Sequence, residues 1–157
     1  MKILILLLMP FSLWAQSKKD IRKNGVKGIT EVVLEYENGK EVVHNDVVRK
    51  FDKEGETILE INYDKNGILK AKTANKFNKD GNKTEEIVYD SAGRQISKEV
   101  YKYNGEGEKI EEIQYDGKNT IVAKTSYVIN NKGLRSEKRT YDANGKLIQS
   151  KKYIYEF

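Results

Sequence analysis

The chain contains no cysteine, and its one proline, one tryptophan and two methionines all lie within the first 14 residues. Without cysteine, the protein has no disulfide framework, no thiol nucleophile, no thiolate metal site and no lipid-bearing cysteine. Clustered basic charge is also missing, because lysine and glutamate alternate along the chain and the net charge is only +5. This spacing argues against nucleic-acid binding and favours a solubilising, mixed-charge sheet face over a surface for anionic polymers.

Only one long apolar run is present, at residues 3–9. Lys2 precedes it and a small residue, Ala15, follows, so residues 1–15 are predicted to be a secretory signal peptide. The run is too short to span a bilayer, and a buried N-terminal strand is the alternative. Removing the signal with Lys2 lowers the net charge from +5 to +4. We therefore expect a soluble product, periplasmic or extracellular, with no transmembrane segment and no lipid anchor.

An aromatic or large apolar residue followed by Asp or Asn, two variable residues and usually Gly occurs eight times, at alternating intervals of 12 and 14 residues. The copies begin at Phe51, Tyr63, Phe77, Tyr89, Tyr103, Tyr115, Ile129 and Tyr141. The Asp or Asn can hydrogen-bond the backbone two residues on, and the last position suits a left-handed conformation. These structural turn positions are Gly55, Gly67, Gly81, Gly93, Gly107, Asn119, Gly133 and Gly145.

The segments between turns have strand length and are rich in Ile, Val, Thr and Tyr. If each turn reverses the chain, the unit is a 26-residue hairpin pair, repeated at 55–80, 81–106, 107–132 and 133–157. Upstream, a degenerate first hairpin has a tight turn at Asn38-Gly39 and a kink at Asn45-Asp46, and residues 16–28 are expected to be a flexible basic arm. The sequence predicts one all-β domain over residues 29–157, an antiparallel meander of about ten strands that forms a curled open sheet or, alternatively, a closed up-and-down barrel.

Tyrosines recur at two positions of the repeat and are expected to line one face of the sheet in two ladders. The third position of each unit, for example Ile110, is out of phase with these ladders. A bulge near Glu85-Glu86 and Glu111-Glu112 would restore the phase; without one, those third-position residues face the other side. The ladders either bind flat ligands or hold the sheet together by cross-strand packing. The candidate ligand-binding residues are Tyr63, Tyr89, Tyr101, Tyr115, Tyr127, Tyr141 and Tyr153.

The motifs at residues 89–94 and 141–147, Tyr-Asp-x-x-Gly followed by Arg or Lys, resemble the YD repeats of bacterial Rhs-type proteins. Residues 36–40, Tyr-Glu-Asn-Gly-Lys, look like the MORN-like repeats of YwqK-type proteins. The repeat array at residues 51–157 carries the resemblance, which implies β-hairpin arrays and export, with no functional residues to carry over. Rhs repeats form a shell around a toxic domain, and this array has too few repeats for that.

Enzyme chemistry is not expected. The single histidine, His44, has no visible nucleophile or orienting partner and is assigned to a solvent-facing strand position. The carboxylate pairs Glu85-Glu86 and Glu111-Glu112 point to opposite faces of their strands, so neither pair can flank one glycosidic bond. The Asp-rich turns reach Gly too early for a calcium loop. We expect no catalytic residues, no metal and no cofactor.

The expected function is that of an exported, non-enzymatic β-repeat protein that acts as a binding or structural surface at the bacterial cell envelope. The alternatives are a carbohydrate- or peptidoglycan-binding module that uses the tyrosine rows, and a YwqK-like partner or immunity-type protein. The expected partner is a protein or a cell-surface glycan. The strand that ends the array presents an edge that could close on the first strand, dimerise or accept a partner strand.

Overall fold

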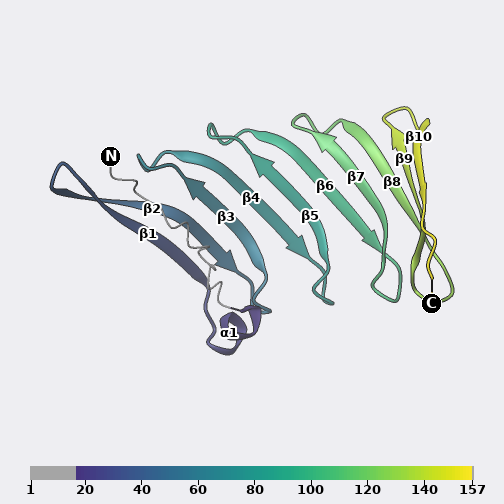
Figure 1. Cartoon of the computed structure of the whole chain (residues 1–157), viewed down its shortest axis with the longest axis horizontal. Coiled ribbons are helices and arrows are strands. Elements are labelled where there is room, and N and C mark those ends of the chain that lie inside the picture. Colours follow the sequence, from purple (N-terminus) through teal and green to yellow (C-terminus); the bar gives the residue numbers. More distant parts are fainter. Residues whose placement is uncertain (1–16, 157) are drawn as a thin grey trace, which may run out of the picture.

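The described part of the chain, residues 17–156, forms a single antiparallel sheet in the computed structural model (Figure 1). Its ten strands follow one another in space in chain order, so the predicted meander is confirmed. The strands are β1 (Gly28–Glu37), β2 (Lys40–Phe51), β3 (Thr57–Tyr63), β4 (Leu69–Phe77), β5 (Lys83–Tyr89), β6 (Gln95–Tyr103), β7 (Lys109–Asp116), β8 (Ile121–Ile129), β9 (Arg135–Asp142) and β10 (Leu147–Lys152). Each 26-residue unit contributes two of them. Among these residues, β1 pairs only with β2 and β10 only with β9, so the sheet is open and the barrel alternative is not adopted.

The repeated turns share one hydrogen-bonding scheme, which the turn after β5 illustrates. The Oδ1 atom of Asp90 accepts hydrogen bonds from the backbone N–H groups of Ala92 and Arg94, both at 2.9 Å. The N–H of Gly93 bonds the Asp90 carbonyl at 3.0 Å, and Gly93 has φ +76°. Only a residue that tolerates the left-handed region closes this turn, and all eight sequence-assigned positions, Asn119 included, have positive φ.

A β-bulge follows every repeated turn. Pairing moves from Lys102–Glu111 to Tyr103–Lys109, so Ile110 is left without a partner on β6. The predicted bulge thus exists, but the out-of-phase third position is itself the extra residue. The equivalent unpaired residues are Ile58, Thr84, Ile110 and Ser136 at one end of the strands and Lys70, Ile96, Val122 and Ile148 at the other.

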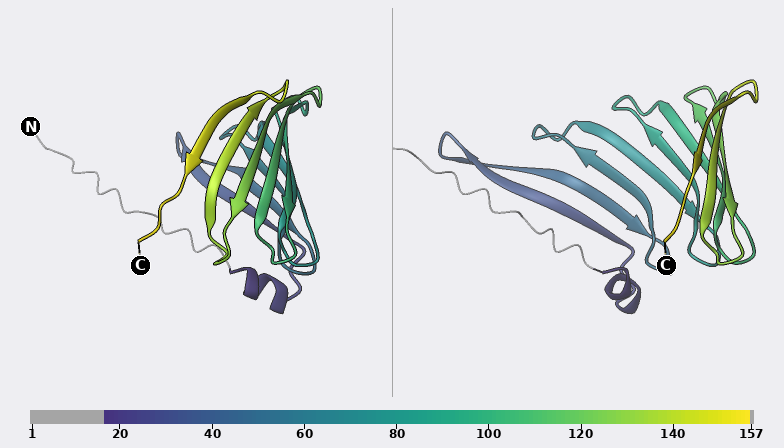
Figure 2. Two further views of the ribbon diagram at one scale, coloured as in Figure 1. Left: turned by 90° about the vertical axis from the view of Figure 1, so that its right-hand side faces the viewer. Right: turned by 45° about the vertical axis from the view of Figure 1, so that its right-hand side comes forward.

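Bulges at both ends of the strands increase the local right-handed twist. The sheet accordingly curls into an open trough, seen in the turned views of Figure 2. The predicted kink in the first hairpin has the same origin, since Asp46 is skipped where pairing passes from Glu31–Val47 to Val32–Asn45.

The segment expected to be a flexible arm contains a short helix, α1 (Lys18–Lys23), in the part that the structure describes. Ser17 caps it by accepting a hydrogen bond from the Asp20 N–H. Ile21 is only 2% exposed, and Lys18 forms an ion pair with Glu56 beside the β2–β3 turn. A single apolar residue and a cap signal in a polar stretch were too little to predict a helix of six residues. The signal peptide predicted for residues 1–15 lies outside the described residues.

The trough has two unequal faces and little core. We call the face that carries Tyr101, Glu112 and Tyr127 the inner face, and the face that carries Glu111 and Tyr115 the outer face. Curvature crowds side chains on the concave side and spreads them on the convex side. All three buried strand residues, Val47, Thr125 and Tyr127, lie on the inner face by register, which identifies it as the concave one.

Candidate binding surface on the inner face of the sheet

The two tyrosine rows lie on opposite faces, so the expectation that they share one face is wrong. Tyr101 pairs with Glu112, whereas Tyr115 of the same regular stretch of β7 pairs with Lys98. Glu112 and Tyr115 are three residues apart, and an odd separation on a strand without a bulge means opposite faces. Counting from the repeat could not settle this, because each turn and its bulge contribute residues that change the phase. The inner row is Tyr101, Tyr127 and Tyr153, and the outer row is Tyr63, Tyr89, Tyr115 and Tyr141.

The inner row is anchored by carboxylates. The hydroxyl of Tyr101 donates to Glu99, and that of Tyr127 donates to Oε2 of Glu112 at 3.2 Å. Burial, reinforced by the charge of Glu112, raises the pKa of Tyr127 to about 12. Burial and the Glu99 hydrogen bond likewise raise the pKa of Tyr101 far above its ordinary value. Both phenols therefore stay neutral hydrogen-bond donors at any physiological pH.

Cations cover the rings of this row. The Lys109 ammonium lies 4.7 Å from the ring centre of Tyr101 and 5.5 Å from that of Tyr127, so it bridges the two rings. The Arg135 guanidinium stacks on Tyr127 at 4.0 Å. Tyr127 is 8% exposed, so its ring serves packing and cation–π contact. Tyr153, at the same repeat position in the last unit, is 37% exposed.

Charge on the inner face changes from one unit to the next. In the second and third units a lysine is matched by a glutamate three residues on, with Lys83–Glu86 at 2.6 Å and Lys109–Glu112 at 2.8 Å. Burial raises the pKa of Glu112, but the hydrogen bonds from Lys109 and Tyr127 and the charges of Lys109 and Lys138 together outweigh it, so this pKa falls below its usual value. Both pairs are therefore ionic and internally neutral.

The fourth unit departs from this pattern. Arg135 occupies the lysine position, but the glutamate position holds Lys138, 5.9 Å from the Tyr127 ring centre. The Nε atom of Arg135 is buried and has no hydrogen-bond partner among the described residues. A buried donor without an acceptor is unfavourable, and no carboxylate within residues 17–156 forms an ion pair with this guanidinium. The sequence carries a signal for this site, the change from Glu to Lys at one position of the repeat, and the tyrosine pattern does not contain it.

The outer face is organised by different pairs. Glu111 lies between two lysines, 2.6 Å from Lys102 and 2.5 Å from Lys124. Glu85 is bracketed in the same way by Lys76 and Lys98. These interactions account for the outer carboxylates as cross-strand supports of the sheet.

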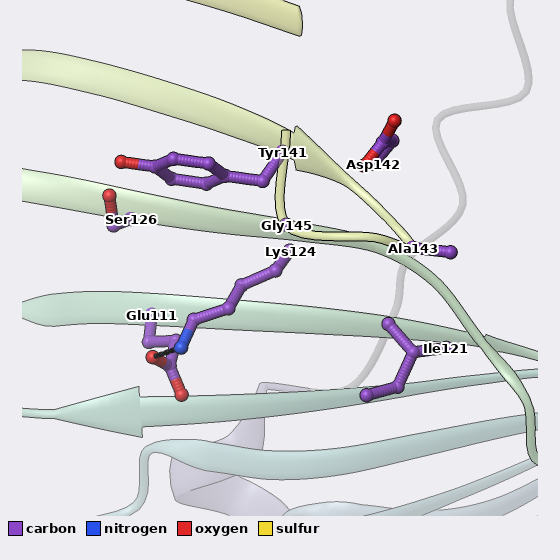
Figure 3. A pocket seen from close by; sticks show the side chains of 8 residues that line it. All are labelled: Glu111, Ile121, Lys124, Ser126, Tyr141, Asp142, Ala143 and Gly145. Atoms are coloured by element: carbon purple, nitrogen blue, oxygen red, sulfur yellow. Dashed lines mark ion pairs between the residues drawn. The ribbon is translucent and has the colours of Figure 1, made fainter. Parts of the chain in front are cut away.

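The outer tyrosines are also partly covered, and one shallow depression lies among them. The Lys72 ammonium sits 4.8 Å from the ring centre of Tyr89, and Lys98 sits 5.7 Å from that of Tyr115. A depression of about 400 Å³ lies between β7, β8 and the β9–β10 turn, where the Tyr141 ring stands over the Lys124–Glu111 ion pair (Figure 3). The depression is wide open, and the two charges of its ion pair already neutralise each other, so few polar groups remain to bind a ligand. Binding roles for the seven tyrosines stay a prediction.

The remaining sequence candidates lie apart from one another. His44 is on the inner face of β2 opposite Val33, not in the solvent-facing position expected, and its side chain is 10% exposed. Its Nδ1 lies 3.3 Å from the carbonyl oxygen of Asn45, and its Nε2 is 3.9 Å from Glu35. Glu111 and Glu112 point to opposite faces, as predicted. Across residues 17–156 no group of three Asp, Glu, His or Cys side chains is placed to hold a metal ion.

No family model matches the chain, and no curated protein matches it. Solved structures share its sheet only loosely. A structure of TarM is 23% identical with a TM-score of 0.34 over 83% of this chain, and a GtfA/B complex bound to UDP and GlcNAc is 16% identical with a TM-score of 0.32 over 79%. The TcdB2-TccC3-TEV structure is 13% identical with a TM-score of 0.35 over 81%. The chain spans 22%, 24% and 8% of these proteins, and likeness at this level carries no functional argument. In residues 17–156, no helix is long and apolar enough to cross a membrane.

Proposed function

We propose that the protein is an exported, non-enzymatic β-repeat protein that acts as a binding surface at the cell envelope, and that the C-terminal end of its inner face binds an acidic ligand. The observation that carries the proposal is the pair Arg135 and Lys138: neither forms an ion pair with a carboxylate in residues 17–156, and Glu112, whose charge acts on Lys138, is held by Lys109. Three units place a carboxylate at the position of Lys138, namely Glu60, Glu86 and Glu112, so the fold itself does not require a cation there.

The chemistry of the ligand follows from the groups that face it. A carboxylate, sulfate or phosphate oxygen would accept from Arg135 and pair with Lys138, while Lys109 is already committed to Glu112. Tyr153 lies next to these cations on the same face and is more exposed than Tyr127. An aromatic ring beside two cations suits an acidic sugar, which offers a flat face and a charge together. An anionic glycan therefore unites the binding-surface function with the carbohydrate-binding alternative.

Titration of the full chain with an oligogalacturonate, a carboxylated sugar, tests the proposal against neutral dextran of equal length. Calorimetry and tyrosine fluorescence should report binding of the acidic polymer alone, weakening as salt is raised. Lys138→Glu restores the residue of the other units, gives Arg135 an acceptor and should weaken binding about tenfold or more, the equivalent of one charge-assisted hydrogen bond.

The matched control is Lys146→Glu, which makes the same change of charge in the β9–β10 turn. It should leave the affinity within about twofold, while the thermal melts of both variants show that the sheet is intact. Equal binding of dextran, or undiminished binding by Lys138→Glu, would contradict the proposal.

A further inference from the structure

The open sheet leaves two strand edges without a partner within residues 17–156, one on β1 and one on β10. Just before β1, the backbone carbonyl of Lys27 accepts a hydrogen bond from the N–H of Phe51. Because hydrogen-bonding residues alternate along a strand, the odd-numbered residues of β1 bond to β2, and the even-numbered residues from Thr30 to Tyr36 direct their N–H and C=O groups away from the sheet. On β10, the Tyr153 N–H bonds the Ser136 carbonyl at 3.0 Å, so Ser150 and Lys152 direct theirs outward. Unpaired backbone groups of this kind are a template for another strand.

The two edges carry opposite charge. Strand β1 contains Glu31, Glu35 and Glu37 and no basic residue. Strand β10 contains Lys151 and Lys152 and no acidic residue, and Lys146 precedes it. Like charges directly opposite one another destabilise a strand pair, whereas opposite charges stabilise it by about 0.2–1 kcal/mol. Pairing β1 with β1, or β10 with β10, is therefore disfavoured, and pairing β10 with β1 is favoured.

We infer that β10 of one copy of this chain pairs antiparallel with β1 of a second copy, so that the meander continues from molecule to molecule. In the register that fits best, Lys151 lies opposite Glu31, both on the inner face, as a pair that does not exchange hydrogen bonds. Ser150 and Lys152 then bond Val32 and Thr30, which are the residues whose backbone groups point outward on each edge.

The same register matches apolar residues on the outer face. Because Ile148 is the extra residue of a bulge, Leu147 comes opposite Leu34. Each of these leucines is 49% exposed in the single chain and would be covered in the pair. Such a head-to-tail contact uses two different surfaces of each copy, so it builds an open chain of molecules or a ring rather than a two-fold dimer.

The absence of cysteine from the chain gives this inference a direct test. Lys151→Cys and Glu31→Cys are made as separate variants of the full-length protein, one of them carrying a mass tag. Opposing residues of a non-hydrogen-bonded pair have Cα atoms about 4.5 Å apart, within the range that a disulfide spans. Mild oxidation of the mixture should give a mixed covalent dimer in at least about tenfold excess over the homodimers of either variant oxidised alone.

Lys152→Cys mixed with Glu31→Cys is the matched control, because it shifts the register by one residue and places the thiol on the outer face. Loss of the cross-link in this control supports the inference, as does a mean mass, by light scattering of the unaltered protein, that rises with concentration and falls with salt. Predominance of homodimers, equal cross-linking in the control, or no mixed dimer at millimolar protein would overturn it. Glu31→Cys should remain folded, since Arg49 keeps its 2.8 Å ion pair with Glu60.

Discussion

Replacing Gly93 by alanine measures the free energy that a residue with a Cβ loses in the left-handed conformation of one turn, with no steric contact added. Gly93 has φ +76°, and a Cβ built there would meet nothing within 4 Å. The left-handed conformation costs a residue with a Cβ about 1–2 kcal/mol. Alanine also lowers the entropy of the unfolded chain, which offsets about 0.4–1 kcal/mol of that cost. The variant should therefore lose about 1 kcal/mol of unfolding free energy, with its strands unchanged.

Gly55 provides the contrast, because it is the same turn position with a neighbour. Its φ is +83°, but a Cβ there would lie 2.7 Å from the backbone carbonyl oxygen of Lys18 in α1. A backbone atom cannot swing away as a side chain can, so the helix must shift, and overpacking of this kind adds about 1–3 kcal/mol. Gly55→Ala should therefore cost clearly more than Gly93→Ala.

Urea unfolding followed by far-UV circular dichroism decides between these costs, with the m-value showing that unfolding stays cooperative. Gly93→Asn is the control and should cost less than alanine, because Asn119 already occupies this position with φ +61°. A stable or stabilised Gly93→Ala variant would refute the account of the turns. Equal losses at Gly55 and Gly93 would show that α1 does not pack against the β2–β3 turn.

Two further predictions concern the carboxylates Asp90 and Glu137 and the hydroxyl of Tyr103. Backbone and side-chain hydrogen bonds from Arg94 hold the pKa of Asp90 below its usual value, and hydrogen bonds from Arg139 and Ser150 lower that of Glu137 to about 2. A carboxyl group whose pKa is lower in the folded chain than in the unfolded chain stabilises the fold at pH values above its unfolded pKa. That stabilisation is lost as the pH falls to the pKa of the folded chain. The melting temperature should therefore stay constant above about pH 5 and fall between about pH 4 and 2. Asp90→Asn keeps an acceptor oxygen, as asparagine does in three other turns, and should flatten that fall; an unchanged slope would contradict the assignment. Tyr103→Phe removes the 2.7 Å hydrogen bond to the Lys83 carbonyl and should cost about 1 kcal/mol in urea unfolding, whereas a neutral substitution would mean that the hydroxyl is equally well satisfied by water.

The architecture could be predicted from the sequence because interactions within each short turn determine it. Each turn needs one acceptor side chain and one residue that tolerates positive φ, and both recur at fixed spacing. The bulges were also signalled, since Ile110 and its equivalents break the alternation of faces. An open curled sheet follows from ten such strands with a twist that bulges reinforce.

The sequence did not determine how many residues each turn and each bulge places between the paired positions of neighbouring strands. Whether Tyr101 and Tyr115 share a face depends on the residues that the turn at Asn104 and the bulge at Ile110 consume, and a difference of one residue exchanges the faces. The helix α1 was missed because its stability comes from contacts with Gly55 and Glu56, distant in the sequence, rather than from its own propensity.

A repeat protein allows its own copies to serve as controls for function. Residues that the fold requires recur, as the turn glycines and the lysine–glutamate pairs do, whereas the fourth unit replaces Glu by Lys138 and Ile by Arg139 and adds Lys151 where earlier units have Thr or Glu. All three substitutions add positive charge or remove negative charge, and they lie on adjacent strands at one end of the sheet. Arg139 forms an ion pair with Glu137, whereas Lys138 and Lys151 form none within residues 17–156. Concentrating such charge destabilises a folded chain unless something outside it supplies the counter-charge. Glu31 of a second copy, which shares Arg49 with Glu60 in its own chain, can pair with Lys151 at the edge, and an acidic ligand can neutralise Lys138 and Arg135 on the face. Lys138 lies opposite Lys151, but the cross-link between Lys151→Cys and Glu31→Cys contains neither charge, so Lys138→Glu should weaken ligand binding without affecting the β10–β1 cross-link.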